Sequence, residues 1–321
     1  MENEQQSKSQ ILLLIAGAKG AVASTVAVAS VVLKHQPELV LPYLTTANRF
    51  ALEVPGNIRV AGWDCSPETL IDCILRHGVL PDQFWKSYEK ELEQTIILPS
   101  PEPDRSLKEQ VEKIARDMRE LTHSIGNCRP VFINLLPAAA SEALDKSTSI
   151  SRLMDSADAT LIPDMAYMLA ALSIQIPVVN FTPNQLELPA ICNEAVRRRV
   201  PISGRDGKTG QTYLKVAFAS ALEARSLRVD GWYSLNILGN ADGRNLMDPQ
   251  RAAGKVANKT NLLDEILGYS VGEAYGTPTH KVVIDYYPPR GDSKEAWDVI
   301  DICGVFGLPM SIRINFQCRD S

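Results

Sequence analysis

The sequence predicts an α/β protein in which a doubly wound parallel sheet is joined to a second, α+β domain. Three observations predict it: short runs of continuous apolar residues, helical segments that alternate with these runs, and a change of pattern near residue 200. A continuous apolar run is typical of a strand buried on both faces, and its alternation with helices indicates parallel β-α units. The length of 321 residues is enough for two domains.

The first part of the chain contains two β-α units. Residues 1 to 10 are polar and lack apolar periodicity, so we expect a loose N-terminal arm. Ile11 to Ala16 predicts a buried strand, which passes through a glycine turn into the Ala- and Val-rich helix Ala21 to Leu33. A second strand, Ile58 to Gly62, precedes a helix near Pro67 to Arg76.

The same pattern continues to about residue 180. Pro81 to His123 is charged and helical in character, but prolines at positions 99, 101 and 103 interrupt it and predict a surface loop. Pro130 to Leu136 and Pro177 to Phe181 are predicted strands, with an apolar helix over Thr160 to Ile174 between them. The alternation supports the doubly wound sheet.

Beyond residue 200 the predicted strands become longer. They cover Leu227 to Leu238, His280 to Tyr287, and Val299 to Cys318 with a break near a glycine, and two helical stretches lie between them. This pattern predicts a mixed or antiparallel sheet. We therefore expect one domain over residues 11–200 and a second over residues 201–321.

Composition narrows the function classes. The net charge of -5 argues against a nucleic acid or an anionic membrane as the main partner. The six cysteines are scattered without a CxxC pair, so reduced thiols in a cytoplasm are expected. The histidines and cysteines show no metal-ligand spacing, so no metal is expected. The apolar run from Ile11 to Ile15 is too short to span a membrane.

A glycine turn follows the first predicted strand. The turn Gly17-Ala18-Lys19-Gly20 can bring backbone N–H groups and a helix N-terminus against a phosphate. Its spacing departs from G-x-G-x-x-G, and the same residues also fit a plain structural turn. Asp64 ends the next strand, where an acid can accept hydrogen bonds from a ribose or cap a helix.

Polar residues and glycines are densest between Asn180 and Lys259, which predicts a ligand site because packing alone explains them poorly. The turn Asp206 to Gly210 fits phosphate or cofactor binding, and it equally fits a turn with a helix cap. Lys255 and Lys259 are four residues apart, so on a helix they would share one face. There they either hold a phosphate together or are simply solvated. Three residues near the end of a strand fit either sugar binding or turn formation: Asn236, Asn240 and Asp242.

In their order along the chain, these segments resemble the myo-inositol-1-phosphate synthase family. The resemblance runs from Ile11 onwards and is strongest from Pro177 to Gly268, and again over Gly291-Asp292-Ser293-Lys294 and Ala296-Trp297-Asp298. It implies a Rossmann domain that holds NAD. It also implies an inserted α+β domain that closes over the substrate and builds a homo-oligomer, a tetramer in this family.

The resemblance implies NAD-dependent isomerisation of glucose 6-phosphate to inositol 3-phosphate. NAD oxidises C5, enolisation and an intramolecular aldol step close the ring, and the stored hydride reduces the inosose. Such chemistry needs cations near the phosphate and the developing oxyanions, and a base for the C6 proton. Two alternatives stay open: a catalytically impaired NAD-binding or assembly protein of the same fold, and another NAD-linked sugar-phosphate dehydrogenase.

The family's motifs imply roles for individual positions. The implied catalytic and substrate residues are Lys255, Lys259, Asn236, Asn240, Asp242 and Asp320. The implied cofactor residues are Gly17, Lys19, Gly20, Ala21, Asp64, Asn180, Thr182, Asp206 and Lys208. A third family lysine is expected just before the strand that begins at His280, where this chain has Thr277, with Lys281 as a substitute if the loop is shifted. The family is expected to continue beyond Ser321 through a returning helix that supplies a further lysine.

Overall fold

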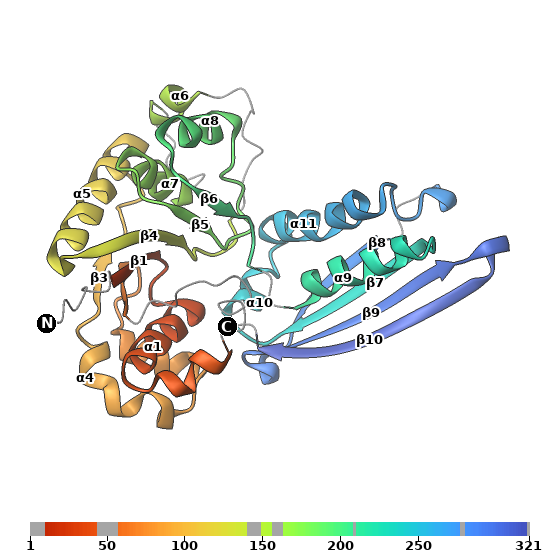
Figure 1. Ribbon diagram of the computed structural model, residues 1–321, viewed down its shortest axis with the longest axis horizontal. Coiled ribbons are helices and arrows are strands. Elements are labelled where there is room, and N and C mark those ends of the chain that lie inside the picture. Colours follow the sequence, from red (N-terminus) through yellow and green to blue (C-terminus); the bar gives the residue numbers. More distant parts are fainter. Residues whose placement is uncertain are drawn as a thin grey trace, which may run out of the picture. The chain divides into compact units, whose positions relative to one another are not determined.

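The computed structural model describes residues 10–43, 57–139, 149–155, 163–207, 210–276 and 280–319. The chain forms two compact units, each with its own sheet. The first comprises Met1–Leu136 and Glu142–Arg205, and the second comprises Pro137–Ser141 and Asp206–Ser321. Figure 1 shows both units, coloured by position in the sequence from the N-terminus to the C-terminus.

The sheet of the first unit has six parallel strands in the order β3-β2-β1-β4-β5-β6. The strands are β1 (Gln10–Ala16), β2 (Ile58–Asp64), β3 (Ile96–Pro99), β4 (Cys128–Asn134), β5 (Val178–Asn180) and β6 (Ile202–Gly204). The chain runs outward from β1 in one direction and from β4 in the other. The carboxyl ends of β1 and β4 therefore form the switch point where such sheets bind ligands. The predicted doubly wound α/β fold is confirmed.

Helices cover both faces of this sheet because successive side chains of β1 point to opposite faces. Leu12 and Leu14 belong to one core with α5, α7 and α8, whereas Ile15 belongs to another with α1, α3 and α4. The helices are α1 (Ala21–His35), α3 (Leu70–His77), α4 (Glu89–Leu92), α5 (Leu107–Ile125), α6 (Ile150–Met154), α7 (Pro163–Ser173) and α8 (Pro189–Arg198). Short 3-10 turns cover Pro37–Leu39, Leu41–Tyr43, Asp82–Phe84 and Lys86–Tyr88.

Two strands of the first sheet were not predicted from the sequence. β3 lies inside the charged segment that was expected to be helical and ends at Pro99, and the surface loop predicted at the prolines follows it before α5. β6 has three residues. Both strands lie at the edges of the sheet, and the apolar run of β3, Ile96 to Leu98, is short and stands inside a charged segment. The long apolar run that reveals a central strand is therefore missing from both.

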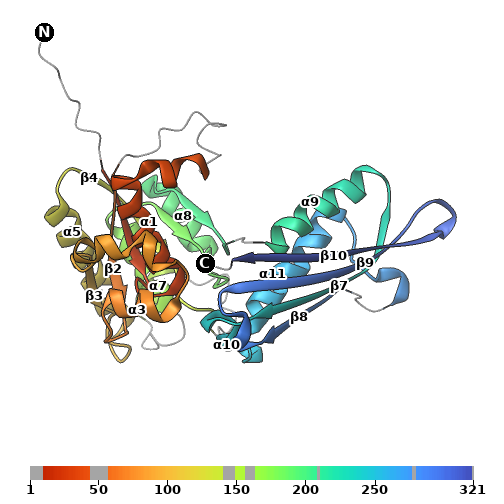
Figure 2. The same cartoon turned by 90° about the horizontal axis from the view of Figure 1, so that it is seen from below.

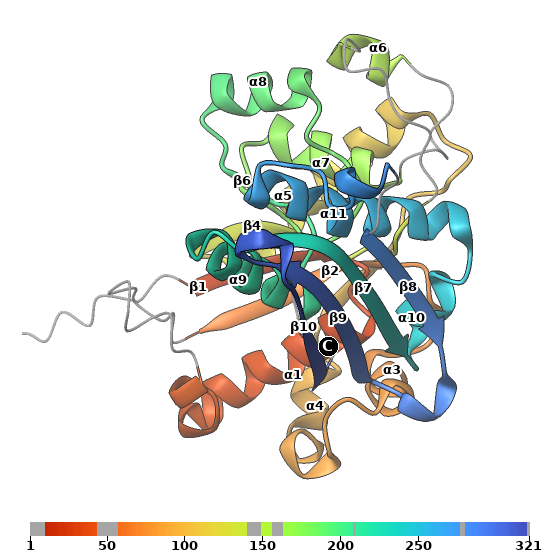
Figure 3. The same ribbon diagram turned by 90° about the vertical axis from the view of Figure 1, so that its right-hand side faces the viewer.

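The second unit contains a mixed four-stranded sheet in the order β10-β9-β7-β8, seen side by side in Figure 3. Its strands are β7 (Arg228–Leu238), β8 (His280–Tyr286), β9 (Ser293–Cys303) and β10 (Pro309–Arg319). β7 and β8 are parallel, and the other pairs are antiparallel. β9 begins at Ser293, six residues before the predicted start of the last strand, because polar residues occupy its first positions.

Two helices pack on one face of the second sheet. α9 (Gln211–Ala224) and α11 (Pro249–Leu267) share a core with Trp232 of β7 and Ile300 of β9 (Figures 1 and 2). The short α10 (Ala241–Asn245) packs against β7 and β8. Short 3-10 turns cover Glu273–Tyr275, Pro288–Arg290 and Val305–Gly307. Among the described residues, no helix is long and apolar enough to cross a membrane.

Gly62 marks the closest approach of β1 and β2. An ideal Cβ at Gly62 would lie 1.9 Å from the carbonyl oxygen of Ile15, its partner in the strand register. Backbone atoms in the middle of a parallel sheet cannot move aside without breaking ladder hydrogen bonds. Glycine is therefore required at this position by contact, not by its dihedral angles.

We expect Gly62→Ala to lower the free energy of unfolding by about 3 kcal/mol, because overpacking against rigid backbone is destabilising. Urea denaturation followed by circular dichroism measures the change. Gly304→Ala is the matched control, since a Cβ there meets side-chain atoms at 3.5 and 3.7 Å, which is ordinary contact. Equal midpoints for both variants would contradict the steric argument.

Candidate functional site

The glycine turn between β1 and α1 lies at the carboxyl edge of the first sheet. Gly17 has a φ of +81°, and a Cβ there would lie 2.9 Å from the carbonyl oxygen of Leu135, so both conformation and space require glycine. The N–H groups of Gly17 and Ala18 donate to the carbonyl oxygen of Trp63 at 2.9 and 3.0 Å. α1 begins after Gly20 without a side-chain cap. Its first-turn N–H groups are therefore suited to an anionic ligand.

Asp64 ties the glycine turn to the loop that follows β2. Its Oδ2 accepts a hydrogen bond from the backbone N–H of Lys19 at 2.8 Å, and its Oδ1 accepts one from that of Ser66 at 2.8 Å. The Nζ of Lys19 donates to the carbonyl oxygen of Ser66 at 2.7 Å. Thr69 caps α3, so the helix-cap alternative for Asp64 is wrong. Each carboxylate oxygen retains acceptor capacity for a further donor.

Asn180 and Thr182 lie in a buried polar network beside this turn. Asn134 and Asn180 end the paired strands β4 and β5, and Asp164 stands at the start of α7. Asp164 Oδ2 accepts from the side-chain amides of Asn134 and Asn184, each at 2.8 Å. Thr182 Oγ1 donates to Asn180 Oδ1 at 2.9 Å. All five side chains are buried, so the network fixes the loop after β5 from inside.

Asp164 was missed in the sequence. Burial raises the pKa of its carboxyl, and hydrogen bonds from Asn184 and Asn134 oppose that rise. One feature of the sequence could have identified Asp164 as a buried polar residue: it is the single charged residue of the apolar helix Pro163–Ser173. A charge in such a helix must find donors inside the protein.

The site residues predicted in the second unit lie in β7, α10 and α11. Asn236 is buried in β7, two residues before the strand ends at Leu238, as the predicted strand placed it. Asn240 caps α10, with its Oδ1 accepting from the N–H of Gly243 at 3.0 Å. Asp242 lies in the first turn of α10, and Lys255 and Lys259 lie in α11, which packs against α9 and β8.

Several predicted positions cannot be placed in these elements. Lys208, Thr277 and Asp320 lie outside the described residues. Asp206, the first residue of the second unit after Arg205, has a φ of +67°. Lys281 is exposed and alternates with the buried His280 on β8, so it occupies the opposite face of the sheet.

A buried polar cluster, missed in the sequence, lies between α9 and the sheet. We call it the Asp298 cluster; its members are Gln211, Lys215, Trp232, Ser234, His280 and Asp298. The sequence of β9 contained an indication, because Asp298 is two residues from each of the apolar Ala296 and Ile300 and so points inward with them. Lys294, four residues before Asp298 on the same face, is also buried.

Lys215 is the fully buried cation of this cluster. Its Nζ lies 2.7 Å from Nε2 of His280 and 5.8 Å from the ring centroid of Trp232. Burial lowers the pKa of Lys215 to about 8, although the negative charge of Asp298 opposes the shift. A lysine in this state changes charge near neutral pH, which an exposed lysine does not.

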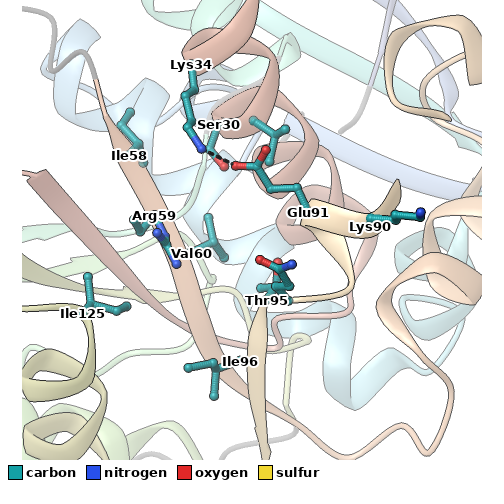
Figure 4. A pocket seen from close by; sticks show the side chains of 12 residues that line it. Ser30, Lys34, Ile58, Arg59, Val60, Lys90, Glu91, Thr95, Ile96 and Ile125 are labelled. Atoms are coloured by element: carbon teal, nitrogen blue, oxygen red, sulfur yellow. Dashed lines mark hydrogen bonds and ion pairs between the residues drawn. The ribbon is translucent and has the colours of Figure 1, made fainter. Parts of the chain in front are cut away.

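A cavity of about 370 Å³ lies at the opposite edge of the first sheet (Figure 4). The starts of β2 and β3 and the second half of α1 line it, and Lys34 and Glu91 pair there at 2.7 Å. It contains none of the predicted site residues. Among the described residues, no group of three or more His, Cys, Asp or Glu side chains could hold a metal ion.

Comparisons of sequence relate the chain to one enzyme family. Residues 210–321 match the family model described as myo-inositol-1-phosphate synthase. The chain is 33% identical over 347 residues to inositol-3-phosphate synthase 1 of Bacteroides thetaiotaomicron, covering 96% of this chain and 80% of that protein. It is 29% identical over 290 residues to inositol-3-phosphate synthase isozyme 1 of Arabidopsis thaliana, covering 83% of this chain. That match covers 57% of the plant protein, so the chain spans little more than half of its length.

Solved structures share the fold. The crystal structure of inositol-3-phosphate synthase from Caenorhabditis elegans matches with a TM-score of 0.81 at 20% identity, covering 98% of this chain and 72% of that one. A myo-inositol-1-phosphate synthase-related protein from Thermotoga maritima matches with a TM-score of 0.75 at 22% identity, covering 97% and 83%. At these identities the likeness concerns the fold alone.

Lys215 predicts a pH dependence of stability. Its folded pKa of about 8 lies below the ordinary value of 10.5, so between these values the unfolded chain binds more protons than the folded one. The free energy of unfolding should therefore rise with pH from about 8 to 10.5, by up to about 3 kcal/mol. Lys215→Met should lack this rise, as measured by urea denaturation at a series of pH values.

The exposed Lys281→Met is the control, and its stability should follow the wild-type curve at every pH. Parallel curves for the wild type and Lys215→Met between pH 8 and 10.5 would show that Lys215 titrates as an exposed lysine does.

Proposed function

The chain belongs to the inositol-3-phosphate synthase family, and from that membership we propose that it converts D-glucose 6-phosphate to 1D-myo-inositol 3-phosphate with NAD. The observation that carries the proposal is 33% identity over 96% of the chain to a protein named for this activity. The resemblance drawn from the sequence motifs is thereby confirmed at the level of the family. The product would enter inositol and phospholipid biosynthesis, and we assign the protein to the cytoplasm.

The glycine turn of the first unit fits a dinucleotide. Gly17 and Gly20 allow the tight turn that brings the chain from β1 into α1, and the uncapped start of α1 at Ala21 offers N–H donors to a pyrophosphate. Asp64 would accept from a ribose hydroxyl while it holds Lys19 in place. Asn180 and Thr182 would support the neighbouring loop from within. Bound NAD supplies a hydride acceptor that later returns the hydride, so no net NADH is formed.

The second unit would hold the sugar phosphate. Lys255 and Lys259 lie one helical turn apart in α11, where two ammonium groups would neutralise the phosphate or an oxyanion that develops during enolisation. One lysine in its neutral form would serve as base for the C6 proton. The residues proposed to orient the hydroxyl groups or line the site are Asn236, Asn240, Asp242 and Asp320, whereas Asp206 and Lys208 are proposed to contact the cofactor.

The uncovered face of the second sheet supports the proposal of a homo-oligomer. α9 and α11 cover one face, whereas Tyr233, Val283 and Trp297 are exposed on the other. Large apolar side chains on a sheet face are typical of protein interfaces. A second copy of this chain, in a tetramer as the family resemblance implies, is the partner we propose.

Incubation of the protein with glucose 6-phosphate and NAD should give inositol phosphate, detected by phosphorus NMR, without NADH accumulating at 340 nm. Recycling of the hydride explains both results together. Stoichiometric NADH would instead indicate a dehydrogenase, and NAD binding without product would indicate an impaired protein.

Lys255→Ala should lower kcat at least about 100-fold, because it removes a cation that stabilises a developing oxyanion. Lys108→Ala is the matched control, since Lys108 is an exposed helical lysine of the first unit. Turnover measured by product formation should be unchanged in the control. Full turnover in Lys255→Ala would refute the role assigned to this lysine.

Tyr233→Lys should convert the oligomer to smaller species, because a charge on the uncovered face must be desolvated at an interface. Size-exclusion chromatography with light scattering measures the mass. Tyr213→Lys, which replaces an exposed tyrosine of α9, should keep the wild-type mass. The same mass for all three proteins would exclude this face as the interface.

A further inference from the structure

We propose that Asp298 is a positioning residue that holds the first turn of α9 and strand β7 in the register that substrate binding requires. The inference rests on the proposed function and extends it to a residue outside the sites described above. Asp298 is 2% exposed and stands on the helix-covered face of β9. Its carboxylate accepts hydrogen bonds from Gln211, Trp232 and Ser234, so its effect on the site passes through the elements that carry these residues.

The carboxylate of Asp298 joins three elements through short hydrogen bonds. Its Oδ1 accepts from Nε1 of Trp232 at 2.7 Å and from Oγ of Ser234 at 2.6 Å, both on β7. The side-chain amide of Gln211, the first residue of α9, donates to Oδ1 at 3.1 Å and to Oδ2 at 3.0 Å. A buried carboxylate with donors on several elements fixes their relative positions, because losing any donor leaves charge without compensation.

Lys215 adds a second link to the same place. It lies one helical turn after Gln211, so both side chains leave α9 on the face that packs on the sheet. Its ammonium stands above the ring of Trp232, whose indole N–H donates to Asp298, and within hydrogen-bond distance of His280 on β8. Lys215 therefore contacts the ring face of Trp232, and Asp298 contacts its N–H group. With the contact between Lys215 and His280, these interactions join α9, β7, β8 and β9.

The cluster adjoins segments proposed to bind the cofactor and the substrate. Gln211 directly follows Gly210, the cap residue of α9, which has no side-chain cap of its own. The turn containing Asp206 therefore enters α9 at the residue that Asp298 holds. On β7, Asn236 lies two residues beyond Ser234, on the same face of the sheet. If Asp298 moved, the segment before α9 and strand β7 would move with it, although Asp298 itself would not contact the substrate.

The test compares Asp298→Asn and Gln211→Leu with Asp301→Asn, an exposed aspartate on the same strand. The first measurement is hydrogen exchange at the start of α9, beginning with the N–H of Leu214, which donates to the carbonyl oxygen of Gly210 at 3.0 Å. Exchange at residues 214–218 should rise about tenfold in the first two variants, because the helix start loses its anchor. Asp301→Asn should match the wild type.

The second measurement is kinetic. Asp298→Asn and Gln211→Leu should each lower kcat/KM for glucose 6-phosphate by about 100-fold, because misplaced groups lose reactive geometry. The double variant should be no slower than Asp298→Asn alone, since the amide then has no carboxylate to hold. A merely structural role would lower the melting temperature and leave kcat/KM of the folded protein unchanged.

Wild-type exchange at the start of α9 in folded Asp298→Asn overturns the proposal, as does additive loss of kcat/KM in the double variant. If Asp298→Asn does not fold, Gln211→Leu with Ser234→Ala decides the question by the same two measurements. If the wild type forms no inositol phosphate, the proposed function fails by itself, and the exchange result still supports or overturns the positioning role.

Discussion

A carboxylate buried away from water must be met by donors, and this requirement organises both units. Asp164 draws Asn134, Asn184 and Thr182 together at the carboxyl ends of β4 and β5. Asp298 draws together α9 and β7 in the second unit. A buried carboxylate that loses a donor is left without compensation, which is costly in the low dielectric of the protein interior. Each carboxylate therefore sets the position of a loop that the proposed function needs.

The two ligand-binding surfaces proposed here are supported in different ways. The glycine turn is shaped by contact, because a Cβ at Gly17 would meet the backbone, and by Asp64, which holds Lys19 and Ser66. The second surface is shaped by secondary structure, because Asn236 belongs to a strand and Lys255 to a helix packed in the layer above it. Rigid elements hold side chains more closely than loops do, which suits proton transfer.

Much of the fold follows from local pattern. The central strands β1, β4 and β5 were predicted because both faces are buried and the sequence is apolar, whereas the edge strand β3 is a short apolar run inside a charged segment and β6 has three residues. In the site, the glycine turn after β1 was predicted from local pattern, whereas the roles of Lys255 and Lys259 in α11 stay predictions. The Asp298 cluster was not, because its members come from four elements separated by up to 87 residues along the chain.

The sequence by itself determined the α/β class, the glycine turn after β1 and the family to which the chain belongs, because these depend on residue type and order along the chain. Only the tertiary structure decided what the polar residues do. Asp64 supports a turn instead of capping a helix, and Lys215 is buried against His280, 65 residues away. Such roles depend on which distant groups share a site free of water, and that is set by packing, not by spacing.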